Sequence, residues 1–281
     1  QYNLTECKLI MKEVIKMKPK IEFISLVSGV DKTMPIIEAS KHKPSWVKKA
    51  AADFKKQGSI AQQFRGGQQM YADPTMQKFS PFDTKHTSKC PALQLYHNTG
   101  YILRTHTDIK LDVSPDGEYF QAMTPGGGNQ EKRPIVTSHM DQSFYPFFEN
   151  WPKGTMKKVL KFDLPWVARI PKGYKMLQMH PMYQDENRFT TLSGILEPHL
   201  GHAAIGTIPF YCHFTGVETI KAGTPVAQFV LIPDDNNEMK VIDFEDDKNY
   251  IKERSINYLQ LQESFNRNYN KMREFWKKYG W

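Results

Sequence analysis

The sequence predicts a mainly β protein with a helical C-terminus. Between Cys90 and Pro233, short β-prone runs alternate with turn residues such as Asn98–Gly100 and Ser114–Gly117, where glycine and proline favour tight reversals. After Pro233, aromatic and apolar residues recur every three or four positions, which is the period of one helical face. We therefore expect antiparallel strands followed by one long amphipathic helix.

The expected elements follow in chain order. A helix is expected after Pro44-Ser45, as far as Phe54, and residues 57–69, rich in Gln and Gly, indicate a loop. The expected strands are Ile21–Val27, Ala92–Tyr96, Tyr101–Thr105, Ile109–Val113, Tyr119–Met123, Val159–Phe162, Val167–Ile170, Tyr174–Met179, Thr191–Leu196, Ala203–Phe214 and Val226–Ile232.

Composition narrows the class of protein. The chain has 281 residues, 40% of them hydrophobic, which is enough to bury a sizeable core. No run approaches the roughly 20 apolar residues of a spanning helix, and residues 1–20 lack the apolar segment of a secretory signal. The cysteines Cys7, Cys90 and Cys212 have no CxxC spacing, which favours a reducing compartment without disulfides. We expect neither membrane insertion nor secretion.

Three segments, taken in order, resemble the trimeric dUTPase and dCTP-deaminase superfamily. Ile170–Tyr174 (IPKGY), Ser193–Glu197 (SGILE) and Ile220–Val230 (IKAGTPVAQFV) match that superfamily's IPPGY turn, AGVID strand and I-x-x-G-x-x-IAQ strand at similar separations. The resemblance implies a small β-barrel from Trp166 to Pro233 and assembly as a homotrimer. With His180-Pro181-Met182, the region is more closely similar to uncharacterised proteins of tailed bacteriophages, a resemblance that brings no known activity.

On this basis the chain divides into four parts. Residues 1–88 form an N-terminal α+β extension with a mobile loop, and residues 89–165 form a β-meander that packs on the barrel. Residues 166–233 form the dUTPase-like β-barrel, and residues 234–281 form a basic amphipathic helix. The predicted fold class is thus mainly β, with an N-terminal α+β extension and a C-terminal amphipathic helix.

The chain departs from the superfamily where its chemistry resides. Glu197 stands at the position of the aspartate that activates water, and Pro198–Gly201 follows without the tyrosine that stacks on deoxyribose. The phosphate-binding Arg-Ser-Ser/Gly segment is absent from His180–Asp185, and no Gly-rich C-terminal arm is present. Because triphosphate cleavage needs charge-paired donors and usually magnesium, we expect no nucleotide hydrolysis and no cofactor.

Some residues of this region remain candidates for a remodelled site. The candidate ligand-binding residues are His180, Glu197, His199 and His202. Neutral imidazole and carboxylate suit zinc or iron, so His180, His199 and His202 are the residues that would bind a metal if one is bound. The spacing matches no established metal motif, and ordinary loop hydrogen bonding is the alternative.

Two surfaces are candidates for partners. An aromatic group is either an interface with another chain or part of the core, and its members are Phe144, Tyr145, Phe147, Phe148 and Trp276. The net charge is +8, and the basic tail is either a solvated face or a nucleic-acid contact through Lys271, Arg273, Lys277 and Lys278.

Three hypotheses follow. The first is a non-catalytic viral (phage) assembly or binding protein, located in the host cytoplasm or the virion, that forms homotrimers or binds other virion proteins. The second is a metal- or small-ligand-dependent enzyme with a remodelled barrel site, and the third is nucleic-acid binding through the basic C-terminal helix. Fold alone does not decide among them, since one barrel serves many functions.

Overall fold

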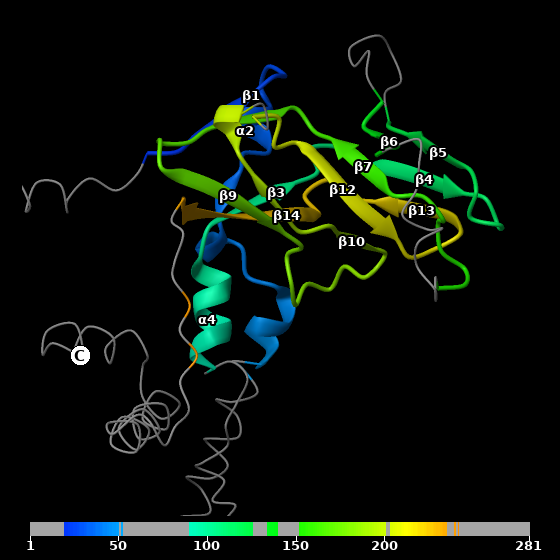
Figure 1. The fold of residues 1–281 in the computed structure, drawn as a ribbon. Helices are drawn as coiled ribbons and strands as arrows, with labels where there is room; N and C mark the ends of the chain where they lie inside the picture. The colour runs from blue at the N-terminus through cyan, green and yellow to red at the C-terminus, as the bar shows by residue number, and fades with distance from the viewer. Residues whose placement is uncertain are drawn as a thin grey trace, which may run out of the picture. The chain divides into compact units, whose positions relative to one another are not determined.

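The computed structural model describes residues 20–50, 52, 90–125, 134–139, 152–200, 203–234, 239 and 241 (Figure 1). The chain forms two compact units. The first contains residues 1–37, 100–182 and 186–235, and the second contains residues 38–99, 183–185 and 236–281. Helix and strand bounds below refer to the described residues.

Strands dominate the first unit, which confirms the predicted mainly β class. The strands are β1 (Glu22–Ser25), β2 (Ile37–Glu38), β3 (Tyr101–Arg104), β4 (Ile109–Val113), β5 (Phe120–Met123), β6 (Val136–Ser138), β7 (Leu160–Asp163), β8 (Trp166–Arg169), β9 (Tyr174–Met179), β10 (Phe189–Thr191), β11 (Gly194–Leu196), β12 (Thr207–Cys212), β13 (Gly216–Ile220) and β14 (Pro225–Pro233). The short helices are α2 (Val30–Thr33), η1 (Ala39–Lys41), α4 (Pro91–Asn98) and η5 (Pro198–Leu200). None of the helices within the described ranges is long and apolar enough to cross a membrane.

The strands form four sheets. One sheet has the order β11-β9-β14-β3-β2, a second β10-β12-β7-β6, a third β13-β4-β5, and β1 pairs with β8 in the fourth. Every strand pair whose register is known is antiparallel. The described strands therefore make several antiparallel sheets, and they do not close into a single barrel.

The three segments that resemble the dUTPase superfamily lie in one sheet. The first leads into β9, the second contains β11, and the third contains β14. In the register, β9 pairs with β11 through Gln178↔Gly194 and with β14 through Phe229↔Gln178. Segments far apart in the sequence thus meet side by side (Figure 1), as the resemblance implies.

Alternating side chains build the core of the first unit. In β4 the pattern is buried-exposed-buried-intermediate-buried, and Ile109, Leu111 and Val113 are fully buried, as expected for a strand with one core face. Phe162, Phe189 and Phe210 meet at the centre, with ring centroids 4.1 Å apart for Phe162–Phe210 and 5.3 Å apart for Phe162–Phe189. Aromatic rings in such offset and edge-on contacts bury large apolar areas.

One predicted strand is a helix. The sequence pattern suggested that Ala92–Tyr96 is extended, but α4 spans Pro91–Asn98. Pro91 occupies the first helical turn, where its missing N–H is no loss, and Gln94 N donates to Cys90 O at 3.0 Å. Leucine and glutamine in the following positions favour the helix. The prediction failed because a short apolar run fits the period of a strand as well as that of a helix.

Other predictions differ in their bounds, and the short strands β2, β6 and β13 were not predicted. The expected strand Thr191–Leu196 is interrupted at Leu192-Ser193, because β10 pairs with β12 whereas β11 pairs with β9 in a different sheet. The expected strand Ala203–Phe214 begins only at Thr207. The edge strand β13 was missed because its GVETI sequence lacks a clear alternation of apolar residues. The helix predicted after Pro44 is confirmed over residues 45–50.

A close backbone approach at Gly206 gives a test of the fold. A β-carbon there would lie 1.9 Å from Leu164 O and 3.1 Å from Trp166 N, and these backbone atoms cannot move without breaking the bonds that join Leu164 and Trp166 to Gly206. We expect Gly206→Ala to lower the free energy of unfolding by about 2–4 kcal/mol in urea titrations.

Gly194→Ala is the matched control, because a β-carbon there would meet nothing within 4 Å. It should leave the midpoint of unfolding nearly unchanged. Equal midpoints for the two variants would contradict the packing between residues 164–166 and Gly206.

Candidate functional site

Glu197, which stands where the resemblance places the aspartate that activates water, forms an ion pair. Glu197 follows β11, and the antiparallel register of β11 with β9 places it across from Lys175. Lys175 Nζ lies 3.1 Å from Glu197 Oε1 and 2.8 Å from Asp234 Oδ1. The hydrogen bonds to Asp234 and then to Glu197 raise the pKa of Lys175, so the ammonium remains charged between two carboxylates.

The candidate His180 lies at the other end of β9. It directly follows Met179, five residues beyond Lys175, which corresponds to roughly 17 Å along an extended strand. Thr191 N donates to His180 Nδ1 at 3.1 Å. The structure therefore does not bring His180 and Glu197 together.

The remaining predicted ligands are His199 and His202. His199 lies in η5, and its Nε2 is 3.2 Å from Pro171 O, whereas His202 lies outside the described residues. No group of three or more His, Cys, Asp and Glu side chains that could hold a metal ion occurs in the described parts of the chain. A metal site at His180, His199 and His202 stays a prediction.

Instead, His180 and His213 lie close to the same strand. His213 Nε2 is 2.7 Å from Thr190 Oγ1, and His180 bonds the next residue, Thr191. Burial lowers the pKa of His180, and the nearby His213 lowers it further, while Glu186 opposes the shift. Burial also lowers the pKa of His213, so both imidazoles are held neutral beside β10.

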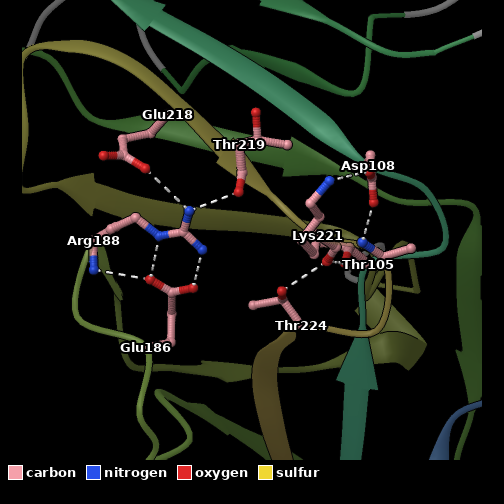
Figure 2. A network of polar contacts seen from close by, with 9 residues as sticks. Thr105, Asp108, Glu186, Arg188, Glu218, Thr219, Lys221 and Thr224 are labelled. Carbon is pink, nitrogen blue, oxygen red and sulfur yellow. Dashed lines mark hydrogen bonds and ion pairs between the residues drawn. The ribbon is translucent and has the colours of Figure 1, made fainter.

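The sequence analysis missed an ionic cluster built around Arg188 (Figure 2). Arg188 Nε donates to Glu186 Oε1 at 2.9 Å and Nη2 donates to Glu186 Oε2 at 2.6 Å. Its Nη1 reaches Thr219 O at 2.7 Å and Glu218 Oε2 at 3.3 Å. Burial alone would raise the pKa of Glu186, but the hydrogen bonds from Arg188 outweigh it and the pKa is lowered. The acid-x-base spacing of Glu186 and Arg188 was the available sequence clue.

A second polar group fixes the turn of the third resembling segment (Figure 2). Lys221 Nζ donates to Asp108 Oδ2 at 2.8 Å, and Ala222 N donates to Asp108 Oδ1 at 2.8 Å. The hydrogen bond from Lys221 has the largest effect on the pKa of Asp108, which it lowers, and the hydrogen bond from Ala222 N lowers it further. The buried Thr105 donates from Oγ1 to Lys221 O at 2.8 Å. These contacts position the turn that leads into β14.

The place of the expected phosphate-binding segment is filled by packing within the second unit. Tyr183, Gln184 and Asp185 belong to that unit together with residues 42–46. Ser45 Oγ donates to Asp185 Oδ2 at 2.5 Å, His42 Nε2 lies 3.2 Å from Gln184 Oε1, and Trp46 Nε1 donates to Tyr183 O. No arginine or lysine occurs in this three-residue segment.

The predicted partner surfaces lie outside the described residues. These are the aromatic group Phe144, Tyr145, Phe147, Phe148 and Trp276, and the basic residues Lys271, Arg273, Lys277 and Lys278. Their roles stay predictions, as does the division into four parts.

The chain was compared with protein families, curated proteins and solved structures. No family model matches the chain, and no curated protein matches it. Among solved structures, it is similar to a mutant dUTPase from phage phi11 of S. aureus, a structure concerned with the coordination of a structural Mg(II) ion. The identity is 13%, the match covers 52% of this chain and 85% of that chain, and the TM-score is 0.26. Because the TM-score is this low, we rest the fold on the strand pairing alone.

The ion pair of Arg188 with Glu186 should stabilise the protein more than the exposed ion pair of Lys221 with Asp108. Arg188→Met would leave Glu186, whose side chain is 10% exposed, without its cation. Breaking a fully buried pair costs about 3–5 kcal/mol, and since Arg188 is partly exposed we expect a loss of about 2 kcal/mol in the free energy of unfolding.

Lys221→Met is the control, because the Lys221 side chain is 71% exposed and its loss should change stability little. Adding Glu186→Gln to Arg188→Met should recover part of the loss. Equal destabilisation by the two single variants would refute the assignment of Glu186 as a buried, compensated charge.

The neutral imidazoles predict loss of stability in acid. The pKa of His180 is lowered from 6.5 in the folded protein, so as the pH falls below that value the unfolded chain takes up the proton first and stability decreases. Each such proton contributes a slope of about 1.4 kcal/mol per pH unit. His180→Asn keeps an acceptor for Thr191 N and removes the titration.

Urea unfolding at several values between about pH 7 and pH 5 should show a shallower decline for His180→Asn than for the wild type. The decline should not vanish, since the pKa values of His97, His139 and His213 are lowered as well. A slope identical to that of the wild type would show that His180 does not contribute.

Proposed function

We propose that the protein is a non-catalytic binding or assembly protein of a phage, built on the strand arrangement that nucleotide-cleaving dUTPases use. The observation that carries the proposal is the ion pair of Glu197 with Lys175 at 3.1 Å. A general base must accept a hydrogen bond from the water it activates. Here the ammonium of Lys175 already occupies Oε1 of the carboxylate and competes with such a water.

The segment Tyr183–Asp185 supports the same proposal. In a triphosphate site, arginine and backbone donors must converge on phosphate oxygens. The side chains of Gln184 and Asp185 instead bond His42 and Ser45. The segment that would bind phosphate in an enzyme is therefore committed to packing within its own unit.

A remodelled enzyme is less well supported. Its site would require His180 and Glu197 to face one substrate, but they lie at opposite ends of β9. The proposal further includes assembly as a homotrimer or with other virion proteins, in the virion or the host cytoplasm. The resemblance to dUTPases and tailed-phage proteins supports this part.

The proposal predicts that the protein does not turn over nucleotides. Incubation with dUTP or dCTP and magnesium should release no pyrophosphate or ammonia above a protein-free sample, because Lys175 pairs with Glu197 and residues 183–185 carry no arginine or lysine. Glu197→Gln should be indistinguishable from the wild type. In native mass spectrometry, the same sample should have about three times the protomer mass of 32.6 kDa.

Two outcomes would count against the proposal. Turnover that disappears in Glu197→Gln would show that the carboxylate works as a base despite Lys175. A monomeric mass would remove the trimeric assembly from the proposal while leaving the absence of turnover to be judged separately.

A further inference from the structure

A cationic and aromatic surface lies on the second unit, and we call it the Tyr183 surface. Its members are Lys43, Trp46, Lys48, Lys49 and Tyr183, which all belong to this unit. The Tyr183 side chain is 56% exposed, and the three lysines are exposed. The surface has no role in the proposed function.

Two short segments hold this surface together. Residues 42–46 lie beside residues 183–185, joined by the bonds His42–Gln184, Ser45–Asp185 and Trp46–Tyr183. Lys49 lies three residues after Trp46 in the helical turn of residues 45–50, a spacing that places both on the same helix face. Lys43 and Lys49 therefore lie on the segment whose Trp46 side chain binds the Tyr183 carbonyl.

Tyr183 is presented in an unusual backbone conformation. Its φ is 61°, and it is the only residue other than glycine with positive φ in the described part of the chain. Such a conformation is costly for a bulky residue and persists where its surroundings over-determine it, often at binding sites. Here Tyr96 and His97 contact the ring edge-on, with centroids 6.0 Å and 6.1 Å from that of Tyr183. The ring is thus held by two aromatic neighbours, while the residue is 56% exposed.

The lysines of this surface lack ion-pair partners among the described residues, and the one carboxylate on the bonded segments, Asp185, accepts from Ser45 Oγ. Within the described residues, Lys43, Lys48 and Lys49 form no ion pair, whereas Lys41 lies 3.5 Å from Glu38. Burial lowers the pKa of His97, and the charges of His42 and Lys43 lower it further. Lys43 is thus close enough to the aromatic group to influence it electrostatically.

We propose that the Tyr183 surface binds single-stranded nucleic acid. An exposed aromatic ring held by its neighbours offers a stacking partner for an unpaired base, and the lysines of the same surface neutralise the adjacent phosphates. In a duplex the bases are already stacked and do not present their faces, so the surface favours single strands. The inference rests on the proposed function only because it takes the protein to be a binding protein. The turnover assay tests the proposed function, and the oligonucleotide assay tests this inference, so the two can fail independently.

The test uses the full chain and a fluorescein-labelled oligothymidylate of about 20 nucleotides, followed by fluorescence anisotropy at several salt concentrations. Tyr183→Ala should weaken binding about tenfold, which is a typical effect of losing one base–aromatic stack, and Tyr183→Phe should weaken it less. The pair Lys43→Gln and Lys49→Gln should lower the slope of log affinity against log salt by about 1.4, at about 0.7 for each phosphate contact.

Matched controls come from the first unit. Tyr119 is 72% exposed, and Lys158 Nζ lies 5.5 Å from its ring centroid, so Tyr119→Ala tests whether any exposed tyrosine near a lysine binds. It should leave the affinity unchanged. The lysine pair also guards against misfolding of Tyr183→Ala, because both lysines are exposed and their loss leaves packing intact.

Four outcomes would overturn the inference, and the first three concern the oligonucleotide. The first is that the protein does not bind the oligothymidylate, and the second is that it binds a duplex of the same length with equal affinity. The third is an affinity and salt slope that are the same in the Tyr183 and lysine variants as in the wild type, which would assign binding to another basic segment. Binding to vesicles of anionic lipid without binding to the oligonucleotide would also overturn it.

Discussion

The pairing of β14 with both β3 and β9 is the constraint on which the rest of the first unit depends. Residues Pro225–Phe229 of β14 pair with β3, and Gln228–Pro233 pair with β9. Val226, Ala227 and Phe229 are fully buried, and the Thr191 hydroxyl donates to Val226 O. Because β14 joins β3 and β9, which are far apart in the chain, its register also fixes where both ends of β9 lie.

The position of β9 separates the candidate groups into two environments. At its start, Lys175 holds Glu197 and Asp234 in a partly exposed ionic group. At its end, His180 is sheltered beside β10 and accepts a hydrogen bond from the backbone. A strand of six residues is long enough to keep these groups apart. The sheet that contains β9, β11 and β14 therefore keeps Glu197 and His180 apart.

Much of this fold was predictable from local pattern. Alternating strands such as β4 and the order of the three resembling segments could be predicted. Both depend on local sequence: the alternation of apolar and polar residues within a strand, and the turn residues between strands. The switch of sheets at Leu192-Ser193 could not be predicted, because it depends on which partner each strand finds. The helix α4 was missed because its short apolar run fits both a strand and a helix. The Arg188 cluster is similar: Glu186 is close in sequence, but Glu218 and Thr219 come from the distant strand β13.

The residues between Met182 and Glu186 show why the site could be predicted less well than the fold. The sequence indicates that phosphate donors are missing there, but it does not indicate what replaces them. The replacement is a tyrosine with positive φ, bound through its carbonyl by Trp46 and followed by an aspartate bound by Ser45. A conformation that breaks a local rule needs such support from distant residues. Because those partners lie about 140 positions away in the chain, only the folded structure shows that this segment is bonded to residues 42–46 and leaves Tyr183 exposed.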